Sequence, residues 1–116
     1  PGQFAPIADF TLLETAVAAA RELGVEMPVG NLLSSDTFYD ASNSTMQWAE
    51  MGVLAVEMES AALYMTAAKL GKRALAICSI SDNIVTGEEL SAAERQTTFT
   101  SMMRIALETA VKMADK

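Results

Sequence analysis

Short apolar segments alternate with helix-period segments along this chain, and the alternation constrains its fold more than any other feature. Residues 25–33, 53–56 and 74–80 predict three strands, of which the second and third are apolar enough to be buried. Strands separated by helices imply right-handed crossovers and a mainly parallel sheet with helices on its faces. The sequence therefore predicts an α/β fold, in which residues 1–116 form a single helix/sheet/helix unit with a central, mainly parallel or mixed sheet.

Helical segments fill the intervals between these strands. The first two have a capping box at the start and a glycine at the end, a pattern that marks both termini of a helix. These signals are Thr11 with Glu14 and then Gly24, followed by Ser44 with Gln47 and then Gly52.

The later helices differ in their apolar faces. Residues 58–70 are apolar on nearly every side, which is typical of a helix packed between layers. Ser91 and Glu94 predict the cap of a last helix. The apolar stripe predicted for that helix comprises Phe99, Met102, Met103, Ala106, Ala110 and Met113.

Composition excludes several functional classes. The chain has 116 residues, 51% of them hydrophobic, which is enough for one packed core and too few for two comfortable domains. Its net charge of -7 argues against a nucleic-acid surface, because phosphate backbones need clustered lysine and arginine. No apolar run is long enough for a membrane span, and no basic-then-apolar signal segment opens the chain. We expect a soluble, cytoplasmic protein without a membrane partner.

Two further features concern the start of the chain and its thiol. Residue 1 is proline, which indicates a processed, cleaved or engineered piece of a longer protein. The single cysteine, Cys78, excludes an internal disulfide. Because it lies within the apolar segment 74–80, we expect an inert thiol in the core.

Acidic side chains follow the two buried strands directly. Glu57 and Glu59 come after residues 53–56, and Asp82 comes after residues 74–80. In open parallel sheets, ligands bind beyond the carboxyl ends of the strands, so these groups are predicted at the binding edge.

Arg95 lies 13 residues after Asp82, on the first turn of the last predicted helix. It shares a face with Phe99 and Met102, so it is expected to point toward the protein body, where a cation needs an anion. Asp82 is the nearest candidate. The pair is either a structural ion pair that fixes the helix or an acid and a cation that face one cleft, an arrangement suited to protonating a leaving group.

Several blocks resemble the C-terminal half of the hexameric bacterial purine nucleoside phosphorylases. The Glu-Met-Glu block is shared with uridine phosphorylases and related nucleosidases, whereas Ala-Glu-Arg-Gln-Thr-Thr-Phe together with Ser-Asp is highly specific for the purine enzymes. The resemblance runs from Phe4 to Met113 and rests on residues 30–39, 56–63, 79–82 and 92–99.

The resemblance implies reversible phosphorolysis of purine ribo- and deoxyribonucleosides to free base and (deoxy)ribose 1-phosphate, in nucleoside salvage. It implies phosphate as co-substrate, no cofactor, no metal, and a cytoplasmic homohexamer built as a trimer of dimers. By the same resemblance, Asp82 protonates N7 of the purine, and Arg95 approaches to stabilise the carboxylate that forms. General acid catalysis of this kind contributes roughly 10²–10⁴-fold.

The resemblance also implies a set of substrate contacts. Glu59 accepts hydrogen bonds from the ribose hydroxyls, which suits an ionised carboxylate with two acceptor oxygens. Met58 packs against the sugar and Phe38 stacks on the purine. The remaining residues expected to line the pocket are Val56, Glu57 and Ser81.

A phosphate site is missing from the chain. Its six glycines do not cluster, and no second arginine accompanies Arg95. In the family, the phosphate-binding glycine and arginines lie in the N-terminal half, and a neighbouring subunit contributes an arginine and a histidine; this chain has no histidine. We therefore expect half of an enzyme, which is inactive without its N-terminal half.

Some alternatives stay open. Asn83 follows the aspartate where well-known members carry histidine, which leaves open the preference between 6-oxo and 6-amino purines. A catalytically silent fragment is the alternative from another functional class. A uridine phosphorylase or a hydrolytic nucleosidase is the alternative chemistry.

Overall fold

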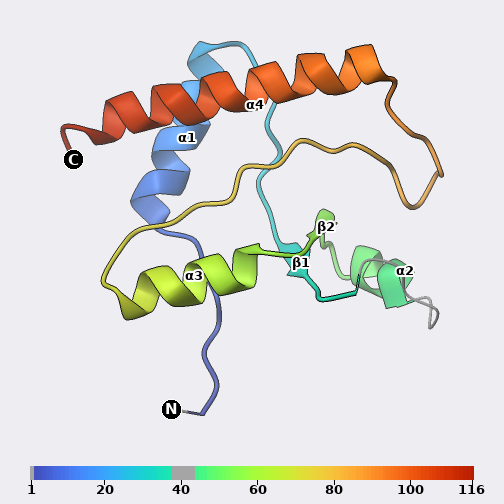
Figure 1. Cartoon of the computed structure of the whole chain (residues 1–116), viewed down its shortest axis with the longest axis horizontal. Helices are drawn as coiled ribbons and strands as arrows, with labels where there is room; N and C mark the ends of the chain where they lie inside the picture. Colours follow the sequence, from blue (N-terminus) through green and yellow to red (C-terminus); the bar gives the residue numbers. More distant parts are fainter. Residues whose placement is uncertain (1, 38–43) are drawn as a thin grey trace. The chain divides into compact units, whose positions relative to one another are not determined.

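The computed structural model describes residues 2–37 and 44–116, which form helices and a small parallel sheet (Figure 1). The helices are α1 (Phe10–Glu22), α2 (Ser44–Glu50), α3 (Ser60–Lys69) and α4 (Ala92–Met113), and the strands are β1 (Leu32–Ser34) and β2 (Ala55–Glu57). The predicted α/β class is confirmed.

The described residues group into two compact units. The first contains the described parts of Pro1–Ala8 and Pro28–Ala74, with β1, α2, β2 and α3. The second contains Asp9–Met27 and Leu75–Lys116, with α1 and α4. That residues 1–116 form one α/β domain stays a prediction.

The sheet of the first unit is parallel. Leu33 lies opposite Val56, and Ser34 lies opposite Glu57. The pairing continues beyond the strand ends, since the Ser35 N–H donates to the Glu57 carbonyl at 2.9 Å. The predicted strand at residues 53–56 is confirmed with a shift to Ala55–Glu57, whereas only the end of the predicted strand at 25–33 falls within β1.

The prediction of a third strand at residues 74–80 is wrong, because these residues carry no strand assignment. An apolar run becomes a strand only where a neighbouring strand offers a hydrogen-bond ladder, and within the described residues β1 and β2 form a two-stranded sheet. The prediction for Cys78 is wrong for the same reason: outside a sheet core, its side chain is exposed.

The second unit is built by packing of α1 against α4, which crosses it in Figure 1. The residues that α1 buries are small and recur at helical spacing, so the two backbones can approach closely. They are Thr15, Ala16, Ala19 and Ala20. Ile105 and Thr109 are buried on α4. The buried Thr109 hydroxyl is satisfied, because it donates to the Ile105 carbonyl at 2.6 Å.

Polar contacts join α1 to the C-terminal end of α4 and to the residue that ends the chain. The Lys112 ammonium lies 2.9 Å from a carboxylate oxygen of Glu22, and the Lys116 Nζ donates to the Thr15 hydroxyl at 2.9 Å. The hydrogen bond to Glu22 is the main cause of the raised pKa of Lys112; desolvation opposes it, and the charges of Glu22 and Glu108 reinforce it.

The stripe predicted for α4 is wrong in position. Phe99 and Met103 are 44% and 53% exposed, whereas Ile105 and Thr109 are buried. The reason is that α1 covers only the face that carries Ile105 and Thr109. The expectation that residues 58–70 pack between layers is likewise not met: Ser60 is the residue buried on α3, because the described sheet is too small to supply a second layer.

Capping explains where the helices begin and end. The capping box predicted at Thr11 and Glu14 is wrong, because α1 is capped by Asp9, whose carboxylate accepts the Leu12 N–H at 2.9 Å. Aspartate is a stronger N-cap than threonine. The predicted stop at Gly24 is confirmed: its φ is 69°, a left-handed conformation that glycine adopts without steric cost.

None of the helices in the described ranges is both long enough and apolar enough to cross a bilayer.

Candidate active site

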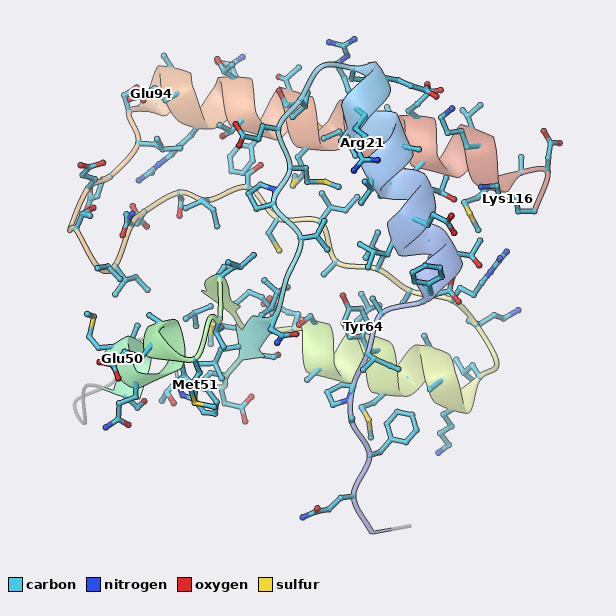
Figure 2. The ribbon with its side chains drawn as sticks, turned by 180° about the vertical axis from the view of Figure 1, so that it is seen from behind. Arg21, Glu50, Met51, Tyr64, Glu94 and Lys116 are labelled. Atoms are coloured by element: carbon cyan, nitrogen blue, oxygen red, sulfur yellow. The ribbon has the colours of Figure 1, made fainter. Side chains whose placement is uncertain are left out.

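The N-terminus of α4 is fixed by local hydrogen bonds. The Ser91 hydroxyl accepts the Glu94 N–H at 3.1 Å, and the Glu94 carboxylate accepts the Ser91 N–H at 3.1 Å. This reciprocal pair confirms the predicted capping box. Figure 2 shows Glu94 at this end of α4 and Lys116 beyond the other end. Hydrogen bonds from the Ser91 N–H and then from its hydroxyl lower the pKa of Glu94 against a weaker opposing effect of desolvation.

The segment before α4 folds back on itself as a short hairpin. The Leu90 N–H donates to the Ser81 carbonyl at 2.9 Å, and Asp82 pairs with Glu89 in an isolated antiparallel bridge. Because Leu90 is followed directly by the cap residue Ser91, the hairpin returns Asp82 to the first turn of α4.

Asp82 and Arg95 meet as the sequence predicts. A guanidinium nitrogen of Arg95, Nη2, lies 3.4 Å from Asp82 Oδ1, and the Ser81 hydroxyl donates to Oδ2 at 3.0 Å. The side chains of Arg95 and Asp82 are 42% and 38% exposed. Charge-assisted hydrogen bonds are usually about 2.7–2.9 Å long, so this contact is loose and contributes little to stability.

Arg95 is also incompletely bonded. Its Nε–H is buried and has no hydrogen-bond partner among the described protein atoms. The loose contact with Asp82 and the unpaired Nε–H together describe a guanidinium that can improve its contacts by a small movement.

In the first unit, the carboxyl ends of β1 and β2 lead to the start of α3. Glu57 is the last residue of β2, and its Oε2 accepts the N–H groups of Glu59 and Ser60, each at 2.7 Å. Its Oε1 accepts the Ser60 hydroxyl. The Ser34 hydroxyl, at the end of β1, accepts the Ala61 N–H at 3.2 Å. These contacts satisfy N–H groups that a helix leaves unpaired at its first turn.

Glu57 is held as a carboxylate by this arrangement. Partial burial acts to raise its pKa, but hydrogen bonds from the Ser60 hydroxyl, from the N–H groups of Glu59 and Ser60, and with Ser34 outweigh it, so the pKa is lowered. The two oxygens of Glu57 are therefore occupied in capping α3.

Glu59 differs from Glu57 in its availability. It occupies the N-cap position of α3, its side chain makes no capping hydrogen bond, and it is exposed. Met58 beside it is also exposed, and Val56 is half-buried in β2. The arrangement leaves one carboxylate and one thioether at the edge of the sheet where a ligand can reach them.

The structure thus gathers the predicted site residues into two groups. Ser81, Asp82 and Arg95 lie together in the second unit, and Val56 to Glu59 lie together in the first. Phe38 lies outside the described residues. Residues 2–37 and 44–116 contain no group of three or more histidine, cysteine, aspartate or glutamate residues that could bind a metal ion.

Sequence reasoning missed residues that support these groups. Ser34 and Ser60 complete the bonding around the start of α3, and the signal was the Glu57-x-x-Ser60 spacing of a side-chain cap. Asn83 was considered only for the preference between purines, and its structural role was missed: its side chain organises the turn after Asp82. The Asn-x-x-x-Gly pattern is the signal for that role.

Comparison with known proteins gives consistent results. A DeoD-type purine nucleoside phosphorylase from Listeria welshimeri is 55% identical over 109 residues, covering 94% of this chain and 47% of that protein. Proteins of the same name from a Geobacillus species and from Geobacillus kaustophilus are each 51% identical, covering 95% and 94% of this chain and 47% and 46% of their own length. The chain spans about half the length of the curated relatives it matches.

The sequence profile of the phosphorylase superfamily matches residues 1–116. The profile therefore includes both groups of candidate site residues, as well as the helices and strands that position them. Since the match extends over all 116 residues, the chain belongs to the phosphorylase superfamily.

Proposed function

We propose that this chain is the C-terminal part of an enzyme that carries out reversible phosphorolysis of purine ribo- and deoxyribonucleosides in nucleoside salvage. The observation that carries the proposal is the contact of Asp82 with Arg95 at the start of α4. Both residues stand in the blocks that resemble the purine enzymes most specifically. The relatives named as purine nucleoside phosphorylases, at 51% to 55% identity, support the same reaction.

The proposed reaction exchanges one bond at the sugar for another. The bond between C1' of the ribose and N9 of the purine breaks, and its electron pair stays with the base. An oxygen of inorganic phosphate forms the new bond to C1', which gives ribose 1-phosphate. Asp82 donates its proton to N7, so the base leaves as a neutral purine.

Arg95 has the complementary role. As Asp82 loses its proton it becomes a carboxylate, and a guanidinium nearby stabilises that charge. The loose 3.4 Å contact leaves room for Arg95 to approach as the proton is transferred. An interaction that strengthens only at that stage lowers the barrier without tightening substrate binding.

The ribose contacts are proposed for the first unit. The exposed, uncapped carboxylate of Glu59 accepts hydrogen bonds from the ribose hydroxyls, and Met58 packs against the sugar. Glu57 acts by holding the first turn of α3 in place rather than through a free oxygen. Val56 in the first unit and Ser81 in the second are proposed as further substrate contacts. Phe38 is the proposed stacking partner of the base.

The rest of the enzyme is proposed from the resemblance. Phosphate is the co-substrate and no other cofactor is required. The N-terminal half completes a layered helix/sheet/helix fold and supplies the phosphate site, and the protein assembles as a hexamer, a trimer of dimers. The isolated chain of 116 residues then lacks a positioned nucleophile.

The experiment uses a completed enzyme, in which this chain is produced together with the N-terminal half of the Listeria welshimeri relative. Release of base from inosine and from uridine is measured with and without phosphate. The proposal predicts release from inosine that requires phosphate. Preferential release of base from uridine would identify a uridine phosphorylase, and release of base without phosphate would identify a nucleosidase. No release from either nucleoside would identify a silent fragment. Each of these results contradicts the proposal.

A further inference from the structure

The segment between Asp82 and Arg95 determines how the candidate acid meets its cation. The two residues are 13 apart, and closing a loop of that length costs entropy that contacts within the loop must offset. Ile84 and Val85, at the tip, are 47% and 57% exposed, so apolar packing does not fix the tip. Hydrogen bonds are the contacts that define its shape.

Asn83 makes the central hydrogen bonds of this turn. Its Oδ1 accepts the N–H of Val85 at 3.0 Å and that of Thr86 at 3.1 Å. Its backbone N–H donates to the Glu88 carbonyl, and its carbonyl accepts the Gly87 N–H, both at 2.7 Å. Any residue except proline can make the backbone bonds, but the side-chain bonds need a short acceptor at position 83.

The turn determines where the ion pair lies, and the ion pair does not determine the shape of the turn. The contact between Asp82 and Arg95 is loose and partly exposed, so it contributes too little energy to shape the turn. The turn is continuous with the bridge between Asp82 and Glu89 and with the bond from Leu90 to Ser81. A change at residue 83 therefore reaches both Asp82 and the start of α4.

We infer that Asn83 is a positioning residue for proton transfer: its amide oxygen closes the turn of residues 83–87 and thereby aligns Asp82 with Arg95. Both lone pairs of Oδ1 are used within the turn, so this oxygen acts through the backbone and not by accepting a hydrogen bond from substrate. The inference rests on the proposed function, since it assigns the alignment of the acid in that reaction.

Two substitutions disturb the same turn by different means. Asn83→Ala removes the acceptor, whereas Asn83→Ser keeps a weaker one. Gly87→Ala strains the backbone alone, because φ at Gly87 is +77° and a Cβ there meets nothing within 4 Å. Gly24→Ala is the matched control, since Gly24 has φ of +69° and equally open surroundings but ends α1.

The readout is the ratio of kcat for inosine to kcat for N7-methylinosine, measured in the completed enzyme. The N7-methylated base leaves without receiving a proton, so the ratio isolates proton transfer from folding and phosphate binding. We expect the ratio to fall about tenfold in Asn83→Ala, because the turn loses the two hydrogen bonds that Oδ1 accepts. We expect a fall of about threefold or more in Gly87→Ala, because a side chain at this positive φ strains the backbone of the turn. Asn83→Ser should restore most of it, and Gly24→Ala should leave it unchanged.

The outcomes distinguish failure of the positioning role of Asn83 from failure of the proposed phosphorolysis. An active enzyme in which Asn83→Ala slows both nucleosides equally, or in which Asn83→Ser is no better than Asn83→Ala, overturns the positioning role. A ratio that falls as much in Gly24→Ala as in Gly87→Ala overturns it too, because general destabilisation then explains the effect. Absence of turnover of either nucleoside by the unsubstituted enzyme contradicts the proposed function itself.

Discussion

Asp82 and Arg95 are the residues on which the proposed chemistry depends. Their contact could be predicted from the sequence because it combines two local signals. An acid directly after an apolar segment and an arginine on the first turn of the next helix are close in sequence, and the helix cap fixes which way the arginine faces. The looseness of the contact could not be predicted, because it depends on the hairpin between them.

Replacing Asp82 tests the acid directly. Asp82→Asn fills the same space but cannot deliver a proton, so we expect kcat for inosine to fall by about 10²-fold or more, with a much smaller effect on nucleoside binding. N7-methylinosine should lose far less. Steady-state kinetics of the completed enzyme checks this, with Asp115→Asn as a control at the end of the chain. Equal losses on both nucleosides contradict the assignment.

Replacing Arg95 separates its catalytic role from a structural one. If Arg95 acts as the proton is transferred, Arg95→Ala should lower kcat about tenfold or more and leave KM nearly unchanged. The matched control is Arg104→Ala, which removes an exposed arginine from the same helix. If Arg95→Ala instead lowers Tm by a large amount and leaves turnover unchanged, the contact of Arg95 with Asp82 is a structural ion pair without a catalytic role.

At the scale of helices and strands, local signals were predictable and long-range pairing was not. The capping box of Ser91 and Glu94 and the stop at Gly24 were correct because such contacts span only a few residues. Residues 74–80 were predicted as a strand from their apolar character, but a strand needs a partner that no local pattern supplies. The stripe of α4 was misplaced because the sequence shows apolar faces and does not show which one α1 covers.

The cap of α4 should respond to pH with a definite sign. Because the pKa of Glu94 is lowered in the folded chain from its ordinary value of 4.5, its stabilising contribution is present above pH 4.5 and is lost as pH falls through the folded-state pKa. Glu94→Gln keeps an acceptor for the capping box but does not titrate.

Thermal unfolding of the unsubstituted chain and of Glu94→Gln, followed by circular dichroism, checks this expectation. The unsubstituted chain should have the higher Tm at about pH 6, because a negative charge at the start of a helix is favourable. The difference should shrink as the pH falls below 4.5 and disappear below the lowered folded-state pKa, where Glu94 is protonated in the folded chain as well. A difference that stays constant, or grows, with falling pH contradicts the assigned pKa direction.

At the scale of the whole molecule, the chain exposes a continuous apolar face. Phe99, Met103, Leu107 and Val111 recur every four residues on α4 and are 44%, 53%, 68% and 66% exposed. Apolar faces of this kind usually mark a surface that another polypeptide covers.

We therefore expect the isolated chain to self-associate. Sedimentation velocity over a concentration series should show species larger than the 12.4 kDa monomer. Leu107→Lys, on the exposed face, should shift the distribution toward the monomer, whereas Ala18→Lys, at an exposed position of α1, should not. A monomer at all concentrations, or equal effects of both substitutions, contradicts self-association through α4.

The most direct measurement is ³¹P NMR of inosine with inorganic phosphate, recorded with the isolated chain, with the completed enzyme, and with the completed enzyme carrying Asp82→Asn. Ribose 1-phosphate should form with the completed enzyme, should not form with the isolated chain, and should form about 10²-fold more slowly with Asp82→Asn. Formation of free ribose in place of ribose 1-phosphate, or equal rates with and without Asp82, would contradict phosphorolysis by acid catalysis.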